Sequence, residues 1–184
     1  MAHVLNFFNR GGNRLVPHAL DMHAGHSVLE VGFGGGAAIP TTLDAVGDDG
    51  MLCAVDLSAD MAVLAGRNFR TAVDAGALFL ACADVEALPL QSAAFDRAYA
   101  FHSHMYWPSP LAGIREMHRV LRPGGRLLLA MDVVSGMRLI EWFGRAYEPA
   151  GPDRLVELFR DAGFVEATTT KLTAGVIGVL GTRR

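Results

Sequence analysis

Apolar positions along the chain fall into short runs, separated by longer segments in which apolar residues recur at helical spacing. This alternation begins at Ser27 and predicts strand–helix–strand units, which build a parallel sheet with helices on its faces. The runs are mostly continuous in Val, Leu and Ala, as is typical of strands covered on both faces. The predicted strands are Ser27–Val31, Met51–Asp56, Leu78–Ala83, Phe95–His102 and Arg126–Asp132.

Two of the helical segments carry start and stop signals. Ser58 is a good N-cap for a helix that runs toward Asp74, and Gly76 is a good C-terminal stop. A second helix is predicted over Ser109–Leu121, since Pro123 cannot continue it. The apolar face of this second helix contains Leu111, Ile114, Met117, His118 and Leu121.

The residues after this helix predict a turn. Pro123-Gly124-Gly125 suits a type II turn, because Pro fixes φ at the second position and Gly supplies a positive φ at the third. A last helix is then predicted near the end of the chain, with Gly163 after it. Its apolar stripe consists of Leu155, Leu158, Phe159 and Ala162.

The end of the chain has a different pattern. Phe164–Leu172 and Val176–Arg183 are two strand-like runs, and only residues 173–175 separate them. A connection this short cannot hold a crossover helix, so the two runs must form an antiparallel hairpin. The sequence therefore predicts one α/β domain over residues 1–184, with a mostly parallel sheet of seven strands that ends in an antiparallel hairpin.

Length, charge and hydropathy narrow the classes of function. A chain of 184 residues fits one domain and leaves no room for a separate substrate domain. The net charge of −3 and the lack of a Lys or Arg run argue against a nucleic-acid partner. No apolar stretch approaches the roughly 18 residues of a membrane helix, and residues 1–14 do not look like a secretion signal. We therefore expect a cytoplasmic protein without a membrane span.

Cysteine and histidine do not show metal-binding spacing. Cys53 and Cys82 both lie in apolar runs predicted as buried strands, where a thiol acts as a small hydrophobe. The pair His102-x-His104 would need further ligands, and the sequence offers no compact cluster of Cys or His. No metal site is expected.

The densest chemical signal is the stretch Glu30-Val31-Gly32-Phe33-Gly34-Gly35-Gly36-Ala37, an apolar strand that ends in a glycine-rich turn before a helix. Glycines let the backbone turn sharply and admit a ligand close to it, while a helix N-terminus offers free N–H groups. The turn therefore predicts a site for a polar ligand, although an ordinary strand-to-helix loop would also contain glycines.

Acidic residues lie at the ends of the first three predicted strands. Glu30, Asp56 and Asp84 would line one edge of the sheet, where open α/β folds bind their ligands. A carboxylate after the second strand can accept hydrogen bonds from the hydroxyl groups of a ribose. The alternative for Asp56 is a capping role near the helix that begins after Ser58.

These motifs together resemble those of the class I S-adenosylmethionine-dependent methyltransferases, from about Ser27 to Arg184. The resemblance rests on the acid and glycines of the first turn, on Asp56, on Asp84, and on Leu121-Arg122-Pro123-Gly124-Gly125-Arg126 before the fifth strand. It implies a small, single-domain protein with a Rossmann-like, doubly wound sheet. It also implies transfer of the methyl group of S-adenosylmethionine to a small molecule, with S-adenosylhomocysteine as product.

The resemblance also implies roles for individual residues. Gly32, Gly34 and Gly36 would lie against the methionine part of the cofactor. Asp56 would bind the ribose hydroxyls, and Asp84 with Val85 would contact the adenine. Glu30 would orient the turn or reach the cofactor amine through water. The predicted cofactor residues are Glu30, Gly32, Phe33, Gly34, Gly36, Asp56, Leu57, Met61, Asp84, Val85, Phe101 and His102.

Two alternative functions use the same residues. Gly32-Phe33-Gly34-Gly35-Gly36-Ala37 also satisfies the pattern of NAD(P)-binding Rossmann oxidoreductases, with an acid about 20 residues further on. The acid ahead of the glycines and the lack of a second domain argue against this reading. A non-catalytic S-adenosylmethionine-binding regulatory module would keep the cofactor acids and lack methyl transfer.

Acceptor-side residues are expected after the fourth strand. Transfer to a hydroxyl or a protonated amine requires a base, and His104 is our candidate for it. Tyr106 and Trp107 would wall the acceptor or simply pack against the helix that follows. Phe8 and Asn13, in the N-terminal arm and helix of residues 1–25, are further candidates for the substrate side.

Residues 133–147, with Met137, Trp142, Phe143 and Tyr147, are also expected to close the pocket. Exposed apolar groups in these two regions would suit a hydrophobic acceptor, and would equally suit a homodimer contact.

Overall fold

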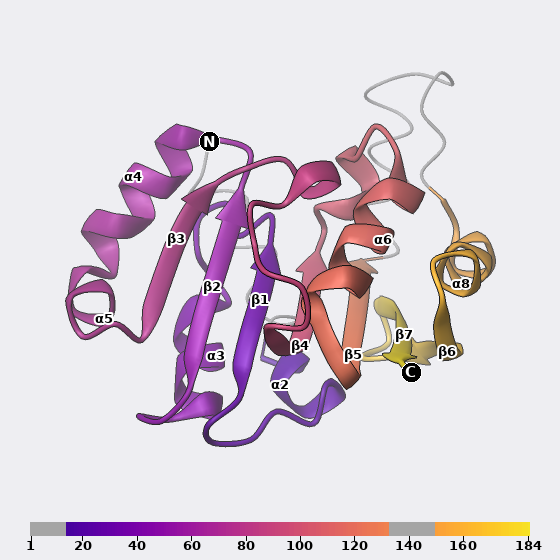
Figure 1. The fold of residues 1–184 in the computed structure, drawn as a ribbon, viewed down its shortest axis with the longest axis horizontal. Coiled ribbons are helices and arrows are strands. Elements are labelled where there is room, and N and C mark those ends of the chain that lie inside the picture. Colours follow the sequence, from indigo (N-terminus) through magenta and orange to yellow (C-terminus); the bar gives the residue numbers. More distant parts are fainter. Residues whose placement is uncertain (1–13, 133–149) are drawn as a thin grey trace.

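The structure is a computed structural model and describes residues 14–132 and 150–184. Its centre is a seven-stranded sheet in the order β3-β2-β1-β4-β5-β7-β6 (Figure 1). The strands from β1 to β5 pair in parallel, and β7 runs antiparallel between β5 and β6. The strands are β1 (Ser27–Val31), β2 (Met51–Asp56), β3 (Leu78–Cys82), β4 (Phe95–Phe101), β5 (Leu121–Asp132), β6 (Phe164–Lys171) and β7 (Val176–Arg183). The predicted sheet with its terminal antiparallel hairpin is confirmed.

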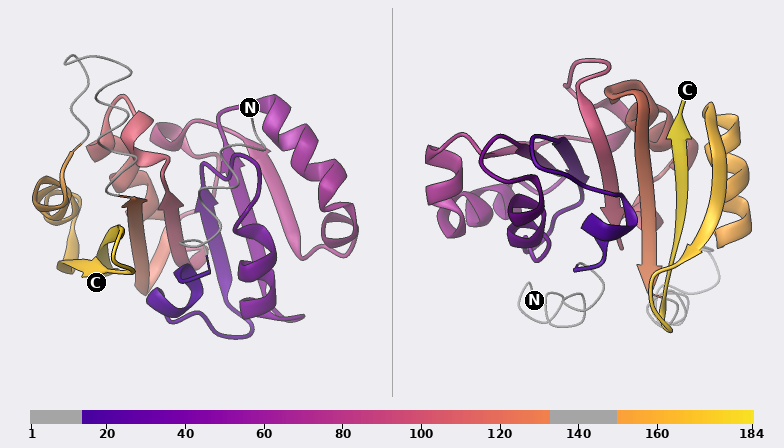
Figure 2. Two further views of the ribbon diagram at one scale, coloured as in Figure 1. Left: turned by 180° about the vertical axis from the view of Figure 1, so that it is seen from behind. Right: turned by 90° about the horizontal axis from the view of Figure 1, so that it is seen from below.

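Helices cover both faces of this sheet (Figure 2). With the labels of Figure 1, they are α2 (Val16–Ala19), α3 (Ile39–Val46), α4 (Ala59–Asn68), α5 (Arg70–Asp74), α6 (Pro110–Val120) and α8 (Pro152–Asp161), with short 3-10 turns η1 (Val85–Ala87) and η2 (His104–Tyr106). The buried residues of α6 and α8 share one core cluster, and those of α2, α3 and α4 share the other. The doubly wound architecture is therefore confirmed as well.

Alternation along β1 explains why both clusters form. Leu29 and Val31 point into the cluster under α6, whereas Val28 points into the cluster under α3. Successive side chains of a strand face opposite sides of a sheet, so an apolar run buries one residue on each face in turn. The exception in this run is Glu30, a carboxylate buried on the α3 side of the sheet.

The helix predicted from Ser58 toward Asp74 begins as expected and is divided in two. The Ser58 hydroxyl accepts from the backbone N–H of Met61 at 3.4 Å, which caps α4. Phe69, with φ −115° and ψ 27°, separates α4 from α5. The chain then turns at Gly76, whose φ of +73° suits glycine.

The fifth strand starts earlier than predicted. Leu121 follows α6 directly and pairs with Phe95, so β5 contains the segment that was predicted as a turn. The register jumps from Phe95–Leu121 to Arg97–Arg126, and the extra residues are accommodated at Gly124, whose φ is +79°. The glycine conformation was predicted correctly, but it serves an irregularity inside a strand.

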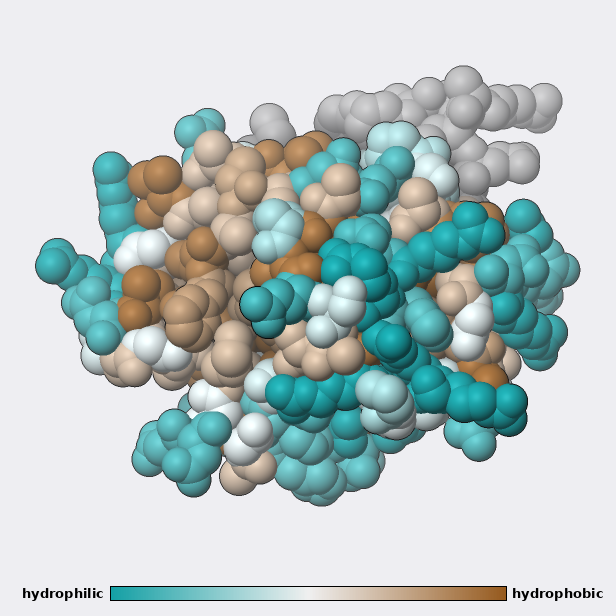
Figure 3. Space-filling view, viewed as in Figure 1, coloured by the Kyte–Doolittle hydropathy of each residue, from teal (hydrophilic) through white to brown (hydrophobic). Residues whose placement is uncertain are grey.

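The prediction that both cysteines are buried is wrong for one of them. Cys53 lies in the core, while Cys82 is exposed because it is the last residue of β3, which forms one edge of the sheet. An apolar surface covers the side of the molecule where α4 and β3 lie (Figure 3). Phe79 of β3 is 51% exposed. In the described part of the chain, no helix has both the length and the apolar character needed to cross a bilayer.

Candidate cofactor site

The carboxyl ends of β1, β2 and β3 lie side by side (Figure 1). We call this row of strand ends the binding edge, as distinct from the edge strand β3. Parallel pairing in this order brings together the residues that end the three strands. Glu30 is the second-last residue of β1, Asp56 ends β2, and Asp84 follows β3 by two residues. The three predicted carboxylates are thus gathered at a single edge.

Gly32 makes the first turn after β1 and is held by close neighbours. Its N–H donates to the carbonyl of Val55 at 2.7 Å, and its φ is +78°. A Cβ at this position would lie 2.2 Å from the Cβ of Ser103, whose hydroxyl donates to the carbonyl of Val31 at 2.7 Å. Only glycine fits here, because the chain leaving β4 packs directly on the turn.

The other two predicted glycines differ in their surroundings. A Cβ on Gly36 would meet the Phe69 ring at 2.7 Å, so this glycine leaves room for the side chain that joins α4 to α5. Gly34 has a φ of +51°, and apart from its chain neighbours no described residue has an atom within 4 Å of the position of its Cβ. Of the three glycines, Gly34 therefore borders open space that a ligand can occupy.

Asp56 joins the glycine turn to the start of α4. Its Oδ2 accepts from the N–H of Gly34 at 2.8 Å, and its Oδ1 accepts from the N–H of Ser58 at 2.9 Å. The capping alternative is therefore part of its role. A carboxylate oxygen has two lone pairs, so each oxygen keeps one acceptor position for a ligand hydroxyl.

Asp84 lies on a loop that is tied to α6. Its Oδ1 accepts from the N–H of Glu86 at 2.9 Å, and its side chain is exposed. Glu86 in turn accepts from the N–H of Ser109 at 2.6 Å, and Glu116 of α6 accepts from the N–H of Leu88 at 2.9 Å. These anchors fix the loop that presents Asp84 and the buried Val85 to the edge of the sheet. The role of Glu86 and Glu116 cannot be predicted from the sequence, because ordinary surface acids give no signal of it.

Glu30 is the most unusual of the three acids. Its side chain is only 4% exposed, and its Oε2 has no hydrogen-bond partner among the described residues. The pKa of Glu30 is raised to about 7, chiefly because burial disfavours the charged carboxylate. A hydrogen bond from the Tyr99 hydroxyl offsets part of this rise, and the nearby charge of Asp56 adds to it. The Tyr99 hydroxyl also lies 2.9 Å from the hydroxyl of Thr42 on α3. Sequence reasoning missed Tyr99 and Thr42, although both are polar residues in apolar surroundings.

The remaining predicted cofactor residues are placed differently from one another. Phe33 and Phe101 are buried in the core cluster on the α3 side, whereas Leu57 is 75% exposed beside Asp56. Met61 is half-buried on α4. His102 has a φ of +59°, which is uncommon for a residue with a Cβ, and its N–H donates to the carbonyl of Ala130 at 2.9 Å.

The segment after β4 holds the predicted acceptor-side residues. His104 is 2% exposed, and neither ring nitrogen has a hydrogen-bond partner in the described parts of the chain. Burial, together with the nearby His102, lowers the pKa of His104 to about 3. Tyr106 is 55% exposed, whereas Trp107 is buried and packs against α6 where Gly113 leaves room for its ring. The packing alternative therefore describes Trp107.

Phe8, Asn13 and the stretch 133–147 lie outside the described residues. Within residues 14–132 and 150–184, no group of three or more His, Cys, Asp or Glu is arranged to hold a metal ion.

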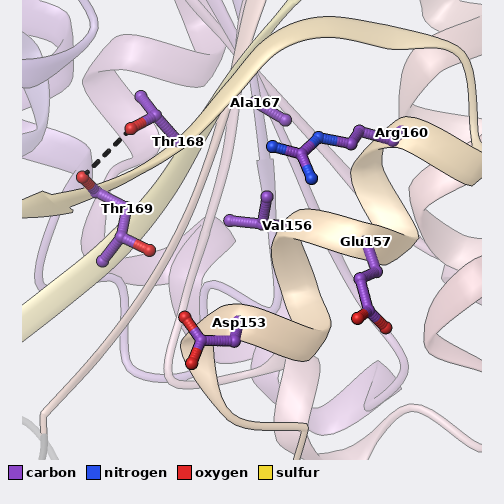
Figure 4. Close-up of a pocket in the computed structure, with 7 residues that line it drawn as sticks. All are labelled: Asp153, Val156, Glu157, Arg160, Ala167, Thr168 and Thr169. Carbon is purple, nitrogen blue, oxygen red and sulfur yellow. Dashed lines mark hydrogen bonds between the residues drawn. The ribbon is translucent and has the colours of Figure 1, made fainter.

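A separate surface hollow of about 400 Å³ lies between α8 and β6 (Figure 4). Its lining consists of Asp153, Val156, Glu157, Arg160, Ala167, Thr168 and Thr169. β6 is the edge strand farthest from β3, so this hollow is remote from the gathered carboxylates. It is not part of the candidate site.

Residues 29–129 match the family model described as a methyltransferase domain. An O-methyltransferase of Pyrenophora dematioidea is 32% identical over 162 residues, which cover 83% of this chain and 57% of that protein. An uncharacterized methyltransferase of Bacillus subtilis, YdaC, is 29% identical over 159 residues, which cover 85% of this chain and 81% of that protein. The chain spans about half the length of most of the curated relatives it matches.

A solved structure with the same fold is that of a SAM-dependent methyltransferase from Aquifex aeolicus. It superposes with a TM-score of 0.80 at 19% identity, over 100% of this chain and 97% of that one. The family match favours the methyltransferase resemblance over the nicotinamide-dinucleotide alternative.

Proposed function

Because this chain belongs to the methyltransferase-domain family that its residues 29–129 match, we propose that it transfers the methyl group of S-adenosylmethionine to a small-molecule acceptor. The observation that carries the proposal is that Glu30, Asp56 and Asp84 lie at the carboxyl ends of β1, β2 and β3, beside a turn whose Gly34 borders open space. These strand ends are the ligand-binding position of open α/β sheets.

The residues present fit S-adenosylmethionine. Gly34 borders open space, Asp56 keeps acceptor positions for ribose hydroxyls, and the unpartnered Oε2 of Glu30 suits a cationic group. Asp84 and Val85 would hold the adenine, as the resemblance implies. When bound, the cofactor supplies a methyl carbon made electrophilic by its sulfonium. The protein's own task is mainly to align the acceptor behind that carbon, since orientation alone can supply much of the rate.

His104 is our proposed acceptor-side residue, and its burial determines the protonation state of its imidazole. With a pKa near 3 its imidazole is neutral at physiological pH, so it can accept a hydrogen bond from an acceptor hydroxyl. A hydroxyl acceptor is also in keeping with the name of the Pyrenophora relative, an O-methyltransferase. We expect His104→Ala to lower turnover about tenfold, as the loss of one hydrogen bond would, while leaving affinity for S-adenosylhomocysteine within about twofold. Unchanged turnover would remove His104 from the mechanism.

The activity is tested by turnover with methyl-labelled S-adenosylmethionine and a metabolite extract as the source of acceptors. Label should pass into small molecules with the wild-type protein and should be lost with Asp56→Ala, which removes the ribose acceptors and unties Gly34. A protein that binds S-adenosylhomocysteine and transfers no label would instead be a non-catalytic binding module.

We also propose that a second copy of this chain pairs along β3. This strand hydrogen-bonds only to β2 within the described chain, and Leu78–Cys82 contains no charged residue or proline to protect the free edge. Two such edges pair antiparallel about a twofold axis and bury Phe79. The cytoplasmic location stays a prediction from the sequence.

A further inference from the structure

A buried carboxylate needs compensation, and Glu30 receives only part of it. The side chain lies on the α3 side of the sheet, with Oε2 unpartnered among the described residues. Leaving a carboxylate ionised in such a position is unfavourable unless a cation or several donors approach it. The binding of a ligand with a positive group beside the glycine turn would supply that compensation.

Two hydroxyl groups connect Glu30 to helix α3. The Tyr99 hydroxyl donates to Glu30, and the same hydroxyl lies 2.9 Å from the hydroxyl of Thr42. Tyr99 has a single hydroxyl proton, so when it donates to ionised Glu30 the proton between the two hydroxyls must come from Thr42. When Glu30 is protonated, the direction of the chain can reverse. The arrangement therefore serves both protonation states.

We propose that Thr42, Tyr99 and Glu30 form a proton-sensitive hydrogen-bond chain, through which binding of the cationic cofactor expels a proton from Glu30 to solvent. The inference rests on the proposed function, because it takes the ammonium of the cofactor's amino-acid part as the cation. Tyr99 and Thr42 are positioning residues in this account, since they act through Glu30 and lie beneath the binding edge.

The charged and titratable groups that face Glu30 come from two neighbouring strands. They are Asp56 of β2, whose charge favours the protonated form, and Tyr99 of β4, which favours the ionised form. In the described structure α3 contributes the neutral hydroxyl of Thr42. A ligand cation is the additional group that would shift the balance to the ionised form.

Ligand binding and ionisation of Glu30 favour each other, so binding releases a proton. Glu30 is half protonated near pH 7 in the free protein, and a bound cation holds it ionised. Binding should therefore release about half a proton at pH 7 and nearly a full proton at pH 6. Affinity for the ligand should fall about tenfold from pH 8 to pH 6.

The test is calorimetric titration of the wild-type protein with S-adenosylhomocysteine in buffers of different ionisation enthalpy. Buffer-dependent heat at pH 7 is the expected result, and it gives the number of protons released. Binding with the same heat in every buffer would overturn the inference and leave the proposed function standing. Failure to bind S-adenosylhomocysteine at all would overturn both.

Variants separate the chain from a merely structural role. Glu30→Gln should bind more weakly and release no proton. Tyr99→Phe removes the donor to the ionised form, so the pKa of Glu30 rises and proton release at pH 7 should approach one. Thr42→Val should shift release in the same direction by less.

Thr41→Val is the matched control, because its hydroxyl bonds to the carbonyl of Ala38 outside the chain. It should titrate as the wild type does. Equal proton release by Tyr99→Phe and Thr41→Val would contradict the proposal. Titration of the ligand's own ammonium is common to all variants and cancels in the comparison.

Discussion

At the scale of single residues, glycine and serine determine the shape of the turn after β1. Gly32 combines a φ of +78° with a Cβ position only 2.2 Å from the Cβ of Ser103. Gly76 has nearly the same backbone conformation, with a φ of +73°, and no described atom near its Cβ position. The two glycines thus separate the effect of backbone strain from the effect of a steric clash.

We expect Gly32→Ala to lower the unfolding free energy by about 3 kcal/mol and Gly76→Ala by about 1 kcal/mol, in denaturant titrations. The difference reflects displacement of Ser103, whose hydroxyl bonds to the end of β1. Adding Ser103→Gly to Gly32→Ala should recover part of the loss. Equal losses from the two alanine variants would show that the contact with Ser103 is unimportant.

Glu30 should make stability depend on pH. Its folded-state pKa of about 7 lies above the ordinary value of 4.5, so folding favours the protonated form. Without cofactor, the unfolding free energy should therefore fall by up to about 3 kcal/mol between pH 4.5 and pH 7 through this residue, and then level off.

Thermal unfolding of Glu30→Gln and wild type measures this effect. The advantage of the variant should grow from pH 5 to pH 8, whatever constant cost its buried amide carries. Glu157→Gln, at an exposed position on α8, should show no such growth. A difference between Glu30→Gln and wild type that does not change with pH would contradict the account.

Sequence reasoning located the residues at the strand ends but did not resolve their individual surroundings. Glu30, Asp56 and Asp84 were predicted because an acid after an apolar run is visible in one dimension. Thr42 and Tyr99 were not, since their contact with Glu30 depends on how α3 packs across β1 and β4. Phe33 and Phe101 lie in the core cluster on the α3 side, which their positions in the sequence do not reveal, since proximity to the turn does not determine which way a side chain points.

At the scale of elements, the loop between β3 and β4 is held in place by α6. Glu116 accepts from the N–H of Leu88, and Arg119 donates to the carbonyls of Leu88 and Leu90. Glu116 and Arg119 also bond each other at 2.8 Å, at positions partly shielded from solvent. The same loop carries Asp84 and Val85, so its rigidity bears on the adenine side of the proposed site.

Glu116→Ala should therefore lower the unfolding free energy by about 1–2 kcal/mol and weaken S-adenosylhomocysteine binding several-fold. The control is Glu157→Ala, which removes an exposed ion pair of the same spacing on α8 and should change neither quantity measurably. Calorimetry and chemical denaturation measure the two effects. Identical behaviour of the two variants would show that the loop does not need its anchor.

Most elements were predictable because their signals are local. Ser58 caps α4 as predicted, Ser109 caps α6 at the predicted start of that helix, and the hairpin of β6 and β7 follows from its short connection. The early start of β5 was not predictable, since pairing of Leu121 with Phe95 is a contact between distant segments. The division of the predicted helix at Phe69 was not predictable either, because neither glycine nor proline stands at this position or next to it.

At the scale of the whole molecule, the free edge of β3 is the feature that a second copy would cover. We expect sedimentation to show a dimer for the wild type and a monomer for Phe79→Lys, because a charge on the edge opposes pairing. Val63→Lys, also at an exposed apolar position but on α4, should remain a dimer. A wild-type monomer at the concentrations used for assays would contradict this pairing.

The central claim is that S-adenosylmethionine binds at the carboxyl ends of β1, β2 and β3. Calorimetric titration with S-adenosylhomocysteine, and in parallel with NAD, tests it most directly. The account predicts one S-adenosylhomocysteine bound per chain, loss of that binding in Asp56→Ala, and no binding of NAD. Binding of NAD without S-adenosylhomocysteine, or S-adenosylhomocysteine binding unaffected by Asp56→Ala, would contradict it.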